Sequence, residues 1–447
     1  MALDGSQFGA LWALPFGGLL LSIAVLPLAA PRLWHAHFGK IAAAWSLVFL
    51  LPFARGQGLE ATAELLVHTL LADYLPFIIL LTALFTAAGG IYLRGNLHGS
   101  AGLNTGLMAI GALLASLMGT TGAAMLLVRP LLRTNDNRRR NAHVMIFFIF
   151  IVGNAGGALT PLGDPPLFLG FLKGVDFLWP LRHLWPQALF LNLALLAIFY
   201  AIDSFHFRRE GPPLQDPTPD TGRLGIEGGI NFLPLLAIAG LVLMSGSWKP
   251  GIAIELLHNR FELQALLRDA LLLAVIAWSL AITPRGVREK NQFSWAPMAE
   301  VAKLFAGIFL TMAPVLAALQ AGEAGAFAAV VHAVADAEGR PLPQAYFWAS
   351  GLLSGFLDNA PTYLVFFNLA GGDPQQLMGT QALVLAAISA GSVFMGALSY
   401  IGNAPNFMVK AVAEQRGVRM PGFFGYMGWS CALLLPLCAL MGWIWFR

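Results

Sequence analysis

Two related stretches of sequence decide the fold of this chain: GALTPLGDPPLF at residues 157–168 and GALSYIGNAPNF at residues 396–407. They begin 239 residues apart (157 and 396), and six of their twelve positions are identical. Each lies inside a long apolar segment, yet carries glycine, proline and polar residues. An interrupted backbone at membrane depth is tolerated only where protein buries it or where it lines a cavity. Two such interruptions at corresponding places are typical of the substrate site of a secondary transporter.

The composition is that of a polytopic membrane protein. Of the 447 residues, 57% are hydrophobic and 11% are charged, whereas soluble proteins have about 25% charged residues. The basic residues lie in short loops and form no basic–aromatic patch, so we expect no nucleic-acid partner. The sequence contains no Walker motif, zinc signature or nucleophile elbow, so it predicts neither an ATP-driven pump nor an enzyme.

Apolar runs of nearly bilayer length predict eight plain membrane spans. Two further apolar regions, 101–133 and 344–371, are interrupted by GTTG at 119–122 and by DNAPT at 358–362. Because their arms are too short to cross a bilayer with ease, we expect a re-entrant helical hairpin in each region. Two broken spans follow the hairpins, at 142–174 and 381–413. The plain spans are expected at 10–31, 41–54, 68–93, 184–204, 229–247, 262–283, 299–320 and 424–446.

The distribution of charge predicts the orientation in the membrane. If both ends of the first hairpin are cytoplasmic, most lysines and arginines fall in cytoplasmic loops, as the positive-inside rule requires. Both termini are then extracytoplasmic, and the second hairpin enters from the opposite side to the first. We therefore expect an all-α polytopic protein of the bacterial inner (plasma) membrane. It would contain two inverted repeats, each with a re-entrant hairpin and a broken transmembrane helix.

The residues of the two breaks suit the binding of small ions. A broken helix exposes N–H groups that favour anions and C=O groups that favour cations. Glycine and proline permit the unwound backbone, and Asn, Thr and Ser supply oxygen ligands of the kind that Na⁺ prefers. The alternative is a kinked helix whose polar side chains satisfy its own backbone. The candidate residues are Asn154, Gly157, Thr160, Gly163 and Asp164 in the first break, and Ser399, Gly402, Asn403, Pro405 and Asn406 in the second.

Two acids, Asp164 and Asp358, lie at membrane depth in this arrangement. A carboxylate there costs at least about 2.5–3.5 kcal/mol, so intramembrane acids are functional by default. Such a group can exchange a proton for Na⁺. The alternative is that each Asp only caps the helix that follows it. We expect Asp164 to lie nearer water and loss of the Asp358 charge to be the more damaging. The residues that could hold Na⁺ are Asn154, Asp164, Asp358, Asn359 and Asn403.

Two basic residues in or beside these segments are weaker candidates. Arg129 lies in the second arm of the first hairpin, where an anion could use it or where it could extend its charge towards the cytoplasm. His143 begins the first broken span beside an arginine cluster. We expect it to be interfacial rather than part of a proton relay.

The sequence GNAGGALTPLGDPP at 153–166 resembles the broken-helix signature of the ion transporter superfamily. That group includes sodium/proton antiporters of the NhaD type, arsenite permeases, citrate-metal symporters and divalent-anion/sodium symporters. DNAPT at 358–362 resembles the hairpin tip of the same superfamily. The opening Asn-Ala-Gly-Gly and the Gly-Asp after the break are most similar to the antiporter branch, whereas Gly-Asp-Pro-Pro is similar to the permease branch. The chain also has a general likeness to bacterial proteins grouped as putative citrate transporters.

This resemblance implies an elevator-type transporter, commonly a homodimer. Residues 1–98 and 229–340 would form the scaffold, 99–205 and 341–447 the moving transport domain, and 206–228 the linker. The first hairpin tip carries Thr-Thr in place of the usual pair with Asn or Asp, which argues against two equivalent ion sites. The functional residues implied at matching positions are Thr120, Thr121, Asn154, Thr160, Gly163, Asp164, Asp358, Asn359, Thr362, Asn403, Pro405 and Asn406.

The sequence therefore favours sodium/proton antiport, because two acids beside carbonyl-rich breaks suit a cation. The alternative is Na⁺- or H⁺-coupled symport of an organic anion such as citrate, or of another small anion, with bound Na⁺ neutralising the acids. A non-transport role leaves the paired breaks unexplained. The expected partners are a small ion or small-molecule substrate, the lipid bilayer and a second copy of the chain. Na⁺ and H⁺ are the expected coupling ions, with no other cofactor.

Overall fold

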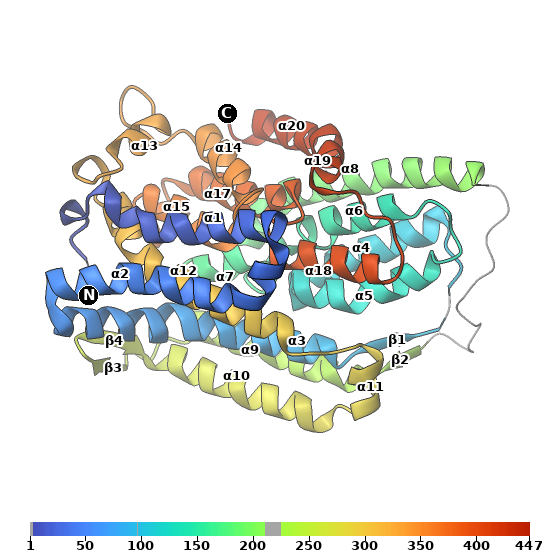
Figure 1. Cartoon of the computed structure of the whole chain (residues 1–447), viewed down its shortest axis with the longest axis horizontal. Helices are drawn as coiled ribbons and strands as arrows, with labels where there is room; N and C mark the ends of the chain where they lie inside the picture. Colours follow the sequence, from blue (N-terminus) through green and yellow to red (C-terminus); the bar gives the residue numbers. More distant parts are fainter. Residues whose placement is uncertain (1–2, 96, 211–224) are drawn as a thin grey trace.

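The computed structural model describes residues 3–95, 97–210 and 225–447. Most of this part of the chain is helical, and the long helices run roughly side by side along the long axis of the molecule (Figure 1). Within it, eight helices are long and apolar enough to cross a membrane. The expectation of a largely α-helical, polytopic membrane protein is confirmed.

The N-terminal helices differ from the expected spans at one place. The expected span at 41–54 is too short, because helix continues on both sides of that apolar run. Polar residues at its flanks, such as Lys40 and Arg55, end the apolar run without ending the helix. Gly58, with φ +89°, marks the kink between two helices that are otherwise continuous. The elements are α1 (Leu14–Ala29), α2 (Pro31–His68), a π-helical segment (Thr69–Tyr74) and α3 (Leu75–Gly89).

The next elements contain the first interrupted region and the first broken helix. The interruption lies at Gly119 alone, with φ +82°, so Thr120 and Thr121 belong to the first turn of the second arm. Helix α4 has length enough to cross a membrane, so the re-entrant path of this hairpin stays a prediction. The elements are α4 (Ala101–Met118), α5 (Thr120–Thr134), α6 (Ala142–Ile151), α7 (Pro165–Leu172) and α8 (Trp179–Arg209).

The second half of the chain contains a further group of plain helices, followed by the second interrupted region and the second broken helix. Its interruption lies at residues 355–358 and overlaps the expected DNAPT (358–362) only at Asp358, so Asn359 and Thr362 are in the first turn of α15. The inverted relation between the halves stays a prediction. The plain group is α9 (Phe232–Ser247), α10 (Leu263–Ile282), α11 (Arg285–Lys290), α12 (Ala296–Gln320) and α13 (Ala328–Ala333). It is followed by α14 (Pro343–Ser354), α15 (Asn359–Leu369), α16 (Pro374–Met378), α17 (Ala382–Phe394), α18 (Ala404–Gln415), α19 (Phe423–Trp429) and α20 (Leu435–Trp445).

Two short antiparallel strand pairs were not expected from the sequence. Strands β1 (Tyr92–Arg94) and β2 (Gly225–Glu227) pair with Tyr92 opposite Glu227, and β3 (Ala253–Leu256) pairs with β4 (Asn259–Glu262). The two pairs lie at opposite ends of the molecule (Figure 1). Of the linker expected at 206–228, residues 211–224 lie outside the described residues, and α8 extends to Arg209.

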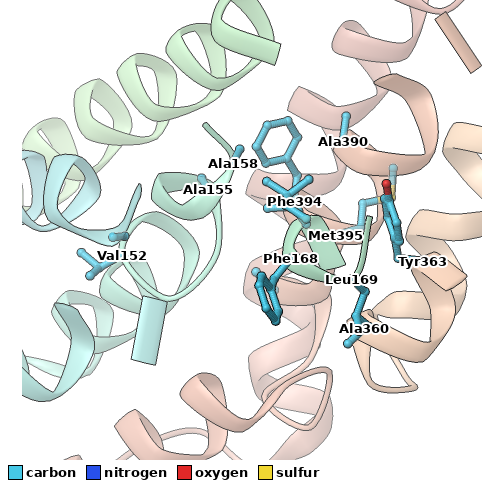
Figure 2. Packing of buried hydrophobic residues seen from close by; sticks show 14 of the residues in the cluster. Val152, Ala155, Ala158, Phe168, Leu169, Ala360, Tyr363, Ala390, Phe394 and Met395 are labelled. Carbon is cyan, nitrogen blue, oxygen red and sulfur yellow. The ribbon is translucent and has the colours of Figure 1, made fainter. Parts of the chain in front are cut away.

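The two halves share one hydrophobic core around the broken helices. Helix α7, from the first half, packs against α15, from the second. Figure 2 shows Phe168 and Leu169 of α7 beside Ala360 and Tyr363 of α15. The first residues after the break at 152–164 are therefore fixed against the arm of the other hairpin.

Each break is closed by a tight approach of two glycine backbones. A Cβ added at Gly163 would meet the carbonyl oxygen of Gly157, and a Cβ added at Gly402 would meet that of Gly396. The two pairs are related by the same offset of 239 (157 to 396, and 163 to 402). Glycine is required at both places because the loop folds back on its own backbone.

Substituting Gly163→Ala or Gly402→Ala should lower stability, because the added methyl group meets backbone that cannot rotate away. Overpacking of this kind costs about 1–3 kcal/mol or more. Thermal unfolding of the purified protein in detergent measures the effect as a lower Tm. Gly106→Ala is the matched control, because Gly106 lies on the exposed side of α4 with open space at its Cβ position. A Tm of either variant equal to that of the control would contradict the close approach.

Candidate functional site

The backbone of the first break is satisfied by side chains that connect it to the hairpin arm α4. Thr160 donates its hydroxyl to the Ser116 carbonyl (2.5 Å), and the Ser116 hydroxyl donates to the Gly156 carbonyl (2.5 Å). The backbone N–H of Leu162 donates to the Thr160 hydroxyl (3.2 Å). The unwound segment thus has hydrogen-bond partners within the protein, and it is buried except at Leu159 and Thr160, which are partly exposed.

The second break is held in a corresponding way. Ser399 donates its hydroxyl to the Gly355 carbonyl (2.5 Å), just beyond α14, and accepts from the backbone N–H of Ile401 (3.3 Å). The acceptor and the donor hydroxyl are each displaced by 239 residues from those of the first break (116 to 355, and 160 to 399). The polar side chains of both breaks therefore bond to a neighbouring hairpin arm as well as to their own loop.

Asp164 lies where the two interrupted regions meet. One of its carboxylate oxygens accepts from the Thr120 hydroxyl (3.1 Å), and the other accepts from the Asn359 side-chain amide (2.7 Å). Its side chain does not cap α7, although it occupies the N-cap position. It is 2% exposed, so the expectation that it lies nearer water is wrong. Among the described residues, no Lys, Arg or His forms an ion pair with it.

Asp358 and Asn359 complete this site, which we call the carboxylate site (Thr120, Asp164, Asp358 and Asn359). Asp358 does cap α15, accepting from the backbone N–H of Ala360 (3.0 Å), and it is partly exposed. It directly precedes Asn359, the residue that donates to Asp164, so both acids belong to this site. The side-chain oxygen of Asn359 is buried and has no donor. That oxygen is therefore free to coordinate a ligand.

Three asparagines connect the two breaks directly. Asn403 donates its side-chain amide to the Asn154 oxygen (2.7 Å), and Asn154 donates to the Asn406 oxygen (2.7 Å). Asn406 donates to the Gly396 and Ser399 carbonyls (2.9 and 3.1 Å), and the Asn403 oxygen caps α18 through the Asn406 N–H (3.1 Å). All three are at most 5% exposed. We call this group the amide cluster.

The structure thus divides the expected site residues into two sets. The carboxylate site holds the acids, and the close approach of Gly157 and Gly163 lies beside Thr120. Asn154 and Asn403, expected as possible Na⁺ ligands with Asp164, instead use their polar atoms on each other and on nearby backbone. The other expected residues have structural positions: Thr160 and Ser399 bond backbone, Thr121 follows Thr120 in α5, Thr362 donates to the Asp358 carbonyl (2.9 Å), and Pro405 lies in the first turn of α18.

A buried ionic cluster around Asp203 was missed in the sequence. Asp203 is fully buried in α8 and accepts from Arg138 (2.6 Å), Asn104 (2.9 Å) and the His143 ring (2.8 Å). His143 is 4% exposed, so it is buried within the protein. Its position at the membrane interface stays a prediction. The sequence did contain a signal for this cluster, because Asp203 is an acid near the end of an apolar run and is followed by basic residues. In the part of the chain that the structure describes, no three His, Cys, Asp or Glu residues are grouped to hold a metal ion.

Comparison with known proteins gives one finding that covers nearly the whole chain. Residues 5–446 match the sequence model of a protein family described as "putative citrate transport". No curated protein matches the chain at a significant level.

The amide cluster predicts a large effect of Asn154→Ala on stability. The change leaves the Asn403 amide without its acceptor and the Asn406 oxygen without its donor, and each buried unsatisfied group costs about 1–3 kcal/mol. The Tm of the purified variant should fall well below that of Asn141→Ala, which removes a single hydrogen bond from a partly buried asparagine. Equal Tm values for the two variants would show that the cluster contributes little to the fold.

Proposed function

We propose that this chain, which belongs to the family described as "putative citrate transport", exchanges Na⁺ for H⁺ at its carboxylate site. Membership of that family and eight helices able to cross a membrane, counted in the described residues, make it an integral membrane transporter. The family description does not distinguish antiport from symport. The choice rests on the chemistry of Asp164 and its neighbours.

The observation that carries the proposal is a buried carboxylate without a basic partner. Asp164 is bonded to a hydroxyl and an amide, which are both neutral. A buried, unpaired carboxylate is costly, so the group is neutralised in practice by a proton or a bound cation. The free oxygen of Asn359 adds a second ligand of the kind that a cation requires.

Competition for one carboxyl group is enough to couple two ions. A proton on Asp164 removes the negative charge that holds Na⁺, and bound Na⁺ removes the site for the proton. The second acid of the site, Asp358, adds negative charge and so favours binding of either a proton or Na⁺. Each ion can therefore leave only when the other takes its place, provided that the empty, ionised site is too costly to move.

We further propose that residues 99–205 and 341–447 move together against a scaffold of residues 1–98 and 229–340. The amide cluster supports this division, because it bonds the two broken helices to each other. The Lys173–Asp73 ion pair (2.7 Å) joins the end of α7 to the π-helical segment of the scaffold. This pair would have to separate during the movement. A homodimer in the bacterial inner membrane, with extracytoplasmic termini, completes the proposal.

A second candidate function is symport of citrate or another organic anion with Na⁺ or H⁺. The family description favours it. In symport, the cation bound at Asp164 neutralises the carboxylate, so that an anion can bind near it. The cation and the anion then cross the membrane together. The carboxylate site is shared by both functions, and the dependence of ion flux on the anion distinguishes them.

Asp164→Asn keeps the size of the side chain and removes the charge, so it should abolish coupled exchange. Loss of a charged ligand is worth about 1.5–3 kcal/mol, or at least roughly a tenfold fall in rate. Asp358→Asn should be milder, which reverses the expectation from the sequence, because Asn caps a helix about as well as Asp and Asp358, unlike Asp164, is partly exposed. Na⁺-driven pH change in proteoliposomes is the measurement. The control is Asp373→Asn, which changes a capping Asp at the surface. Exchange at the control rate in Asp164→Asn would exclude the proposed site.

An inward Na⁺ gradient should make the lumen of proteoliposomes alkaline without any organic anion, because Na⁺ entry expels protons. A pH-sensitive dye in the lumen records the change, with and without citrate. Protein-free vesicles give the leak rate. A Na⁺ influx that appears only when citrate is present, together with uptake of labelled citrate, would replace antiport by symport.

A further inference from the structure

Arg129 is a buried cation without a counter-charge. It lies in α5, is 8% exposed, and its Nε has no acceptor. Its guanidinium makes one long hydrogen bond, from Nη2 to the side-chain oxygen of Gln292 (3.4 Å). Among the described residues, no Asp or Glu forms an ion pair with it.

Other buried arginines of the described chain are paired or well bonded. Arg138 contacts the carboxylates of Asp203 and Glu210. Arg268, which is 3% exposed, pairs with the Asp269 carboxylate (2.8 Å). Even the partly buried Arg288 donates to the Thr86 carbonyl and to groups around Ser279. Because an unpaired charge is costly inside a membrane protein, intramembrane ionisable residues are normally paired or functional. Arg129 is therefore an exception that requires an explanation.

The surroundings of Arg129 add positive charge. Arg133, one turn further along α5, and Arg416, at the end of α18, are the charged side chains that act on it. Arg133 is already occupied by the Tyr92 hydroxyl and the Leu93 carbonyl. Arg416 is exposed. The positive charges of Arg133 and Arg416 thus attract an anion, and the Nε–H group of Arg129 is a donor without an acceptor.

The position of Arg129 connects it with the hairpin tip. Thr121, Met125 and Arg129 are spaced by four residues and lie along one face of α5. Met125 packs with Phe85 of α3 and Met298 of α12. This face is therefore turned towards the plain helices of both halves. At 1.5 Å per residue, Arg129 lies about 12 Å along the helix from Thr121.

We propose that Arg129 anchors a small oxyanion, such as a carboxylate, at the contact between α5 and the loop that carries Gln292. A guanidinium presents parallel N–H groups that match two oxygens of one carboxylate. The Gln292 oxygen occupies part of this position in the free protein, through a bond long enough to be displaced easily. The inference goes beyond the proposed ion exchange and does not depend on which ion Asp164 binds.

Binding to the purified full-length protein tests the inference without any transport assay. Citrate and sulfate are titrated into protein in nanodiscs of phosphatidylcholine alone, at constant ionic strength, with calorimetry and Tm as readouts. We expect citrate or sulfate to bind and to raise the Tm. If neither binds there, but phosphatidylglycerol in the nanodisc raises the Tm through Arg129, the oxyanion is a lipid phosphate. Failure of all three ligands would overturn the proposal.

The variants identify the anchor. Arg129→Gln should weaken binding about ten- to a hundredfold, the range for a charged hydrogen-bonded pair. Arg129→Lys keeps the charge without the planar fork, should fold like the wild type, and should bind more weakly than it. Arg416→Gln is the control, because it removes a nearby exposed charge and should change the affinity less than threefold. Unchanged affinity in both Arg129 variants, with Na⁺/H⁺ exchange intact, would reject the anion site and leave the proposed function standing.

Discussion

The structure depends on one constraint: a backbone carbonyl or N–H left unpaired within a bilayer costs several kcal/mol. Both broken helices satisfy it in part with side chains. Thr160 and Ser399 reach the arms of the adjacent hairpins, and the amide cluster bonds one break to the other. The hairpins are therefore needed to complete the broken helices, and the two halves form one core.

The two breaks satisfy this constraint alike but offer different chemistry. Asp164 and Asn403 occupy corresponding positions, each at the start of the helix after its break. The Asn403 amide donates one bond and accepts another within the protein, whereas Asp164 is a carboxyl group with which no described basic residue pairs. The side chain of Asn403 in the second break is therefore bonded within the protein, whereas we propose that Asp164 in the first break binds an ion. We therefore propose a single carboxylate-centred site, which the Thr-Thr departure at the first hairpin tip also favours.

The sequence predicted the interruptions well, because glycine, proline and polar residues in apolar runs have a direct physical cost. It also identified Asp164 as a candidate, for the same reason. It did not predict that Asn359 would be the partner of Asp164, since partner choice depends on how the two hairpins approach each other. Asp203 lies inside the expected span at 184–204, and it was missed because its partners Arg138, Asn104 and His143 come from distant parts of the chain. The span at 41–54 was underestimated because hydropathy measures apolar length and not helix length.

The amide cluster has a consequence for the biogenesis of the protein. Asn154 and Asn403 are 249 residues apart, so ribosomes working at roughly 5–20 residues per second take about 12–50 s to deliver the second after the first. During that time the inserted first half holds an amide and a carboxylate in the membrane without their distant partners. The hydrogen bonds of the amide cluster thus cannot form until α18, one of the last helices, has been synthesised. Insertion chaperones and membrane proteases have that interval in which to recognise a truncated chain.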